Sequence, residues 1–334
     1  MVEPLQNLSL ADTQPLPDIT VPFKPWKNGG LINRHRLFKT LATCATHQGV
    51  QPDVSYGVNA FLHKRFLHPD FNLAQVVTFM VALSQLTEGV NYYKSRSLNY
   101  LSEGSDVDAV LHQTLENARF MIGFFGLDFF SRSHRFPERR KIFFKALIPD
   151  SNFYLTAKAG SGAGTFSVDF ALGIEKGQGF ASNRGEIWRT GFDTEVLPDE
   201  KLGVRIIRTG NGVRHDPSKT AQFEVFKDSF KTSPARALTP LVICYAQRVR
   251  PDRITALSTH GAKILSSLPK DPHAYSYTRL FREIGFVGRE DGYWLELAAL
   301  PNPRKRERAG FERLTETFRN LRDADGKTLP LLES

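Results

Sequence analysis

Cysteine is scarce in this sequence, whose 334 residues include only Cys44 and Cys244. No Cys-x-x-Cys pair occurs, so the ligand spacing of a structural zinc site is missing. Two cysteines in a chain of this length do not form a disulfide framework. We therefore expect two free thiols, no disulfide and no metal site.

Long apolar runs are missing as well. The longest, from Phe120 to Phe130, is too short to cross a bilayer and contains Asp128. The residues from Met1 to Pro4 lack the basic charge and apolar run of a secretory signal peptide. These absences predict a cytoplasmic protein without a transmembrane segment.

Several familiar catalytic motifs are also absent from the sequence. It contains no GxGxxG after a predicted strand, no GxxxxGK followed by Ser or Thr, no HExxH and no GxSxG. Nucleotide hydrolysis and the standard serine and zinc hydrolases are therefore disfavoured.

Positive charge, by contrast, is in excess: 44 lysines and arginines against 35 acidic residues give a net charge of +9. This balance favours anionic partners, from an anionic small molecule or phosphate-rich coenzyme to an anionic membrane surface. Nucleic acid is disfavoured, because no reading helix or aromatic-basic stacking motif is recognisable. The basic clusters at 132–141 and 304–308 also fit ordinary solvated surfaces.

The apolar pattern divides the chain into four parts. Residues 1–30 hold five prolines, which predicts an irregular N-terminal arm. Residues 31–135 predict a helical region, because apolar residues recur three and four apart over 73–86 and again over 107–122. Residues 136–300 predict a domain that contains strands, and residues 301–334 a basic C-terminal helix and tail.

Strand-like patterns begin near residue 140. Three segments separated by turns, 141–148, 153–156 and 165–174, predict an antiparallel meander. Residues 175–232 suggest a loop-rich insert with one strand at 204–207. Alternating helices and strands follow, at 233–250, 253–258, 276–284 and 292–297. This order predicts an α/β (α+β) fold in which helices flank a mixed sheet.

The end of this domain carries a fold resemblance. Residues 277–286 form a helix that ends in Gly285-Phe286 and precedes a strand at 292–297. This pattern resembles the closing helix and strand of the GNAT acyltransferase fold. The resemblance implies a GNAT-like mixed sheet in which two neighbouring central strands separate to admit acetyl-CoA or another acyl-CoA. We expect the strands at 166–174 and 254–258 to be that pair.

A second resemblance rests on the order of five segments, 233–238, 254–258, 275–277, 288–293 and 304–308. Their residues and order are similar to those of the VirK/YbjX family of Gram-negative bacteria, over about residues 60–320. The resemblance implies a cytoplasmic bacterial protein associated with virulence, envelope stress or resistance to antimicrobial peptides. It implies no particular reaction.

An acyl-CoA donor needs a site for its pyrophosphate, and helix N-termini supply backbone N–H groups for anions. The helix that begins at Ser233 is the first candidate, with Lys231 and Arg236 adding positive charge. Gly177 and Gly179 are a second candidate, because glycine lets the backbone approach an anion closely. The alternatives are an ordinary helix start with solvated charges and a simple turn.

Acyl transfer also needs proton acceptors and donors. Glu175, which follows the long strand, and His260, just past the strand that ends at Ser258, are candidate acceptors. Tyr277 is the candidate donor to the leaving thiolate, because Phe281 occupies the position where GNAT enzymes often carry a tyrosine. Each also fits an exposed loop residue or a packing residue.

Two functions are open from the residues alone. The chain is either an acyl-CoA-dependent N-acyltransferase-like enzyme or a non-catalytic regulator or adaptor that kept the fold. Binding of acetyl-CoA or long-chain acyl-CoA distinguishes the first. Salt-sensitive peripheral binding to anionic membranes distinguishes the second.

Overall fold

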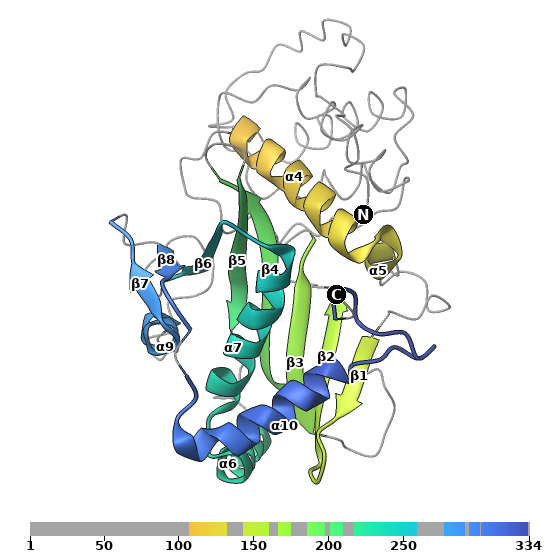
Figure 1. Cartoon of the computed structure of the whole chain (residues 1–334), viewed down its shortest axis with the longest axis vertical. Helices are drawn as coiled ribbons and strands as arrows, with labels where there is room; N and C mark the ends of the chain where they lie inside the picture. The colour runs from red at the N-terminus through yellow and green to blue at the C-terminus, as the bar shows by residue number, and fades with distance from the viewer. Residues whose placement is uncertain are drawn as a thin grey trace, which may run out of the picture.

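A mixed sheet organises the part of the chain that the structure describes (Figure 1). This computed structural model describes residues 107–131, 143–159, 166–174, 186–197, 201–209, 217–258, 277–290, 294–300 and 302–332. Within these ranges the sheet has eight strands in the order β1-β2-β3-β4-β5-β6-β8-β7. They are β1 (Phe143–Leu147), β2 (Phe153–Ala159), β3 (Val168–Ile174), β4 (Glu186–Val196), β5 (Leu202–Thr209), β6 (Arg253–Leu257), β7 (Phe286–Gly288) and β8 (Trp294–Leu297).

The first five strands form an antiparallel meander, which confirms the predicted meander and extends it by two strands. β5 and β6 then run parallel, and β6, β8 and β7 are again antiparallel. A parallel pair needs a crossover connection. Here it contains α6 (Pro217–Phe230) and α7 (Pro234–Ala246). The predicted α/β class with a mixed sheet is confirmed.

The two strands expected to be central neighbours are not neighbours. β3 pairs with β2 and β4, whereas β6 pairs with β5 and β8. They share one sheet, but β4 and β5 lie between them. The expectation was wrong because the sequence pattern placed no strand at 186–196. The neighbouring parallel strands in the described sheet are β5 and β6.

β4 is the longest described strand, with 11 residues. All residues from Glu186 to Thr194 are buried, so the strand is covered on both faces. The glycines at 177, 179 and 185 suggested a loop here, and the buried charged residues Glu186, Arg189 and Asp193 did not indicate a strand of the core. α6 and β7 were likewise not predicted.

Three helices pack on one face of the sheet: α4 (Val107–Phe125), α7 and α10 (Arg308–Arg319) (Figure 1). Their shared core is aromatic. The ring of Tyr245 in α7 lies 5.3 Å from Phe170 of β3, 5.4 Å from Phe318 of α10 and 6.3 Å from Phe125 of α4. The other described helical segments are α5 (Leu127–Ser131), η7 (Gln247–Val249), α9 (Tyr277–Ile284) and η8 (Lys305–Glu307).

Some predictions lie outside the described residues, namely the arm at 1–30, the helix at 73–86 and the thiol of Cys44. Cys244 is a free thiol, as predicted. None of the helices within the described ranges combines the length and apolar character needed to cross a membrane. The boundaries at residues 136 and 300 stay predictions. α4 and α10, from either side of them, contact strands of the same sheet.

Candidate functional site

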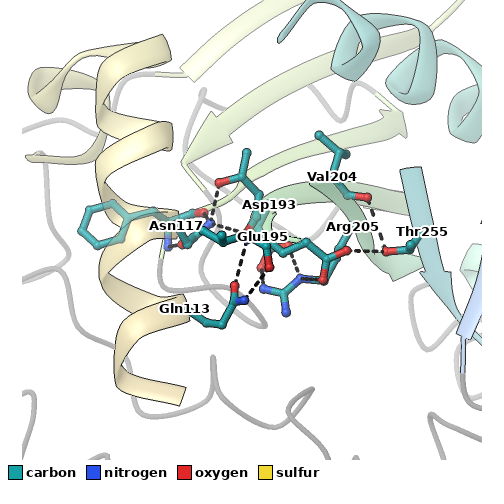
Figure 2. Close-up of polar contacts among 10 residues, drawn as sticks. Gln113, Asn117, Asp193, Glu195, Val204, Arg205 and Thr255 are labelled. Carbon is teal, nitrogen blue, oxygen red and sulfur yellow. Dashed lines mark hydrogen bonds and ion pairs between the residues drawn. The ribbon is translucent and has the colours of Figure 1, made fainter. Parts of the chain in front are cut away.

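A row of polar side chains crosses the sheet on the face opposite α7 (Figure 2). In the strand register, Asp193 of β4 stands opposite Arg205 of β5, and Arg205 stands opposite Thr255 of β6. The preceding residue of β4, Phe192, contacts Tyr245 on the α7 side. Because side chains alternate along a strand, Asp193 points to the other face. All three polar residues of the row are buried.

Asp193 and Arg205 form a two-bond ion pair. Arg205 donates from Nε to Asp193 Oδ1 at 2.9 Å and from Nη2 to Oδ2 at 2.8 Å. Burial raises the pKa of the Asp193 carboxyl to about 6, although the charge and hydrogen bonds of Arg205 oppose the rise. The row therefore contains a carboxyl group that titrates close to neutral pH.

Glu195 lies two residues after Asp193 on β4, on the same face of the sheet, and extends this row. Its Oε1 accepts a hydrogen bond from the Thr255 hydroxyl at 3.1 Å, and its Oε2 lies 3.9 Å from Arg205 Nε. The Glu195 side chain is 18% exposed, against 2% for Asp193. Because solvent reaches it, Glu195 is the carboxylate of this row that is placed to exchange a proton with a bound molecule.

The row lies next to the point where the parallel strands stop pairing. The β5–β6 register ends at Ile206↔Ala256, one residue beyond Arg205 and Thr255. Past that pair, Arg208 of β5 stays registered with β4 and Leu257 of β6 with β8. Each strand thus keeps its outer neighbour while their mutual pairing ends. In open α/β sheets, ligands bind outside the carboxyl ends of such strands.

A second buried cluster lies on the same face, on β2, β3 and β4. Lys158 Nζ lies 2.8 Å from Glu186 Oε1, and Arg189 also donates to Glu186. Arg189 Nη1 lies 3.8 Å from Asp169 Oδ2. Burial opposes ionisation of Glu186, but the charges of Lys158 and Arg189 outweigh it and hold the pKa of this carboxyl below its ordinary value. Two cations and two carboxylates balance, so the cluster joins strands without a net charge.

The residues predicted to bind the acyl-CoA donor, Lys231, Ser233 and Arg236, lie together at the start of α7. Ser233 is the N-cap, and its hydroxyl accepts a hydrogen bond from the backbone N–H of Arg236 at 3.3 Å. The Arg236 guanidinium lies 3.6 Å from Glu283 of α9. Lys231 is exposed, with a left-handed φ of 56° at the junction of α6 and α7. The predicted helix start is thus confirmed, and two of its polar groups already have partners within the protein.

The other predicted site residues are not described. Glu175, Gly177, Gly179 and His260 lie outside the described residues. Tyr277 is the first residue of α9, and its side chain is likewise outside them. Phe281 is buried and lies 5.1 Å, ring to ring, from Phe286, so this position serves packing.

The sequence reasoning missed Asp193, Glu195, Arg205 and Thr255. For Asp193 and Glu195 the signal was the repeat of two along β4, where Arg189, Gly191, Asp193 and Glu195 alternate with larger or less polar residues. Such spacing places one set of side chains on one face of a strand.

Among the described residues, no group of three or more histidine, cysteine, aspartate and glutamate side chains could hold a metal ion. Comparison with protein-family models, with curated proteins and with solved structures found no match to this chain.

Proposed function

We propose that this protein is an acyl-CoA-dependent N-acyltransferase with a GNAT-like sheet, in which β5 and β6 are the strands that separate around the thioester. One observation carries the proposal: Asp193 stands opposite Arg205, one residue from the pair at which β5 and β6 stop pairing, and the carboxylate of Glu195, which stands opposite Gly203, reaches Thr255 in the same row. A proton acceptor beside the separating strands is what acyl transfer to an amine requires.

In the proposed reaction, an amine nitrogen forms a bond to the thioester carbonyl carbon and the bond to sulfur breaks. Glu195 accepts the proton that the nitrogen loses, and Thr255 and Arg205 hold this carboxylate in place. The thiolate leaves and is protonated, with Tyr277 as the predicted donor. Glu195 thus takes the place of Glu175 and His260 as the proposed base, because its carboxylate is held by Thr255 and is partly exposed.

The proposed donor site stays at the start of α7, with Lys231, Ser233 and Arg236. Arg236 is bound to Glu283 in the structure, so phosphate groups of the donor would have to take the place of Glu283. Gly177 and Gly179 remain the predicted alternative.

The test has two steps on the full chain. We expect isothermal titration to show binding of acetyl-CoA or of a long-chain acyl-CoA, and Glu195→Gln to abolish transfer to an amine while donor binding stays. Glu224→Gln is the matched control, because the pair of Glu224 with Lys227 lies on the surface. Absence of binding by both donors would end the proposal.

A non-catalytic regulator or adaptor is the second candidate. It is favoured by the internal partners of Ser233 and Arg236, and by the exposed basic residues Arg304, Lys305, Arg306 and Arg308. Under this candidate the resemblance to the VirK/YbjX family is retained, and the protein is proposed to be cytoplasmic with peripheral contact to the membrane. It predicts sedimentation with anionic liposomes that weakens as salt is added, and no turnover of any acyl-CoA.

A further inference from the structure

One edge of β4 extends beyond its neighbour. The register between β3 and β4 ends at Val168↔Phe192, whereas β4 runs on to Val196. On its other edge, β4 stays paired with β5 as far as Val196↔Leu202. The last residues of β4 therefore have no strand partner on the β3 side within the described register. Buried backbone groups need hydrogen-bond partners, so this edge has to be completed by something other than a strand.

Two side-chain amides of α4 complete it (Figure 2). Gln113 donates from Nε2 to the Val196 carbonyl at 2.6 Å and accepts from the Val196 N–H at 2.9 Å. Two residues that face each other in an antiparallel ladder exchange hydrogen bonds in the same way. The Gln113 amide thus occupies the place of a strand residue.

Asn117, one turn further along α4, joins the segment just before β3 to β4. It donates to the Thr194 carbonyl at 3.1 Å and to the Phe166 carbonyl at 3.2 Å. Its Oδ1 accepts from the Phe166 N–H at 3.3 Å. Asn117 is buried, so these bonds form away from water, where their loss is most costly.

The backbone that these amides hold carries the carboxylates of the site. Glu195 lies between Thr194 and Val196, and Asp193 comes directly before them. We infer that Gln113 and Asn117 are positioning residues, which hold β4 so that its carboxylates reach their partners on β5 and β6. Their effect on catalysis rests on the proposed function, whereas their effect on β4 does not. A shift of a catalytic group by about 1 Å lowers rates by about two orders of magnitude.

The test uses Gln113→Ala, because Gln113 is only partly buried, with Asn117→Ser as a second variant. We expect the Val196 amide to exchange with solvent at least about tenfold faster in Gln113→Ala, since its acceptor is gone. We also expect the carboxyl ¹³C titration of Asp193 to move down by about one pH unit, as a loosened β4 admits water. The described charged groups that face Asp193 are Arg205 and Glu195, and both are unchanged in the variants. If acyl transfer is found, kcat should fall with little change in KM for the donor.

Leu314→Ala is the matched control, because it opens a cavity in α10 without touching the amides. It should lower the free energy of unfolding without changing the pKa of Asp193. The exchange rate of the Val196 amide should keep its ratio to the rates of neighbouring amides. The inference is wrong if Gln113→Ala or Asn117→Ser behaves like Leu314→Ala. Both measurements need no acyl donor, so a wild type without transfer activity would overturn the proposed function alone.

Discussion

Glu195 and Gly203 stand opposite each other on β4 and β5, and the glycine leaves the space that the glutamate side chain crosses. A Cβ added to Gly203 would lie 2.6 Å from Glu195 Cγ and 3.1 Å from Glu195 Oε1. Non-bonded carbon atoms do not approach to 2.6 Å, so Glu195 would have to move. Glu195 reaches Thr255 on β6 over this gap, so a residue without a side chain is needed in β5.

Gly203→Ala should therefore displace Glu195 from Thr255. We expect a loss of about 1–3 kcal/mol in the free energy of unfolding, which is the usual cost of overpacking. If the proposed function is correct, transfer should also fall while donor binding stays. Denaturant unfolding and donor titration measure the two effects separately.

Gly288→Ala is the control for that substitution. Gly288 also lies in a strand, but the nearest atom to an added Cβ, Leu295 Cδ2, is 4.0 Å away. This variant should be as stable as the wild type or slightly more so, because alanine restricts the unfolded chain. Equal losses in the two variants would contradict the role assigned to the gap at Gly203.

Asp193→Asn should change how stability depends on pH. The pKa of Asp193 is raised by burial, from an ordinary 3.8 to about 6 in the folded protein. The folded state therefore binds the proton more tightly than the unfolded state does. The contribution of this group to stability is complete below the ordinary pKa and is lost as the pH rises through about 6. The wild type should accordingly gain stability relative to Asp193→Asn as the solution is acidified from neutral pH.

The size of this gain follows from the shift. Between neutral pH and about pH 5, the difference in unfolding free energy between wild type and Asp193→Asn should move by about 1 kcal/mol in favour of the wild type. Other titrating groups are common to both proteins and cancel in the difference. Parallel stability curves over this range would show that Asp193 does not titrate there.

The sequence predicted those parts of the fold whose pattern is local. The alternation over 165–174 and the Ser233–Pro234 start of α7 are local patterns, and both the strand β3 and the helix cap were found. The alternation also suggested that one face of this strand is partly open, which was wrong, because all residues from Val168 to Gly173 are buried. β4 was missed because its pattern depends on distant partners. Glu186 is neutralised by Lys158, 28 residues away, and Asp193 by Arg205, 12 residues away. Without those partners, a run with so many charges does not predict a buried strand.

The same reason limited prediction of the candidate site. The start of α7 was predicted because capping is local. The contact between Arg236 and Glu283 joins two helices, and the sequence of neither helix predicts it. Glu195 became a candidate only once the register placed it beside Thr255. Pairing across β4, β5 and β6 depends on the order of the strands in the sheet. That order could not be predicted while β4 was missing from the predicted elements.

Glu186→Gln tests whether the buried cluster on β2, β3 and β4 is needed for stability. The substitution leaves Lys158 and Arg189 buried without the carboxylate that both contact, so we expect a loss of about 3–5 kcal/mol at neutral pH. Glu224→Gln breaks a pair whose side chains are 54% and 55% exposed, and it should change stability by less than about 0.5 kcal/mol.

Because the pKa of Glu186 is held below its ordinary 4.5, its contribution is present at neutral pH and lost on acidification below that value. Denaturant midpoints at neutral and acidic pH should therefore show the gap between wild type and Glu186→Gln closing in acid. A gap that stays constant, or a loss no larger than that of Glu224→Gln, would mean that the cluster does not hold these strands together.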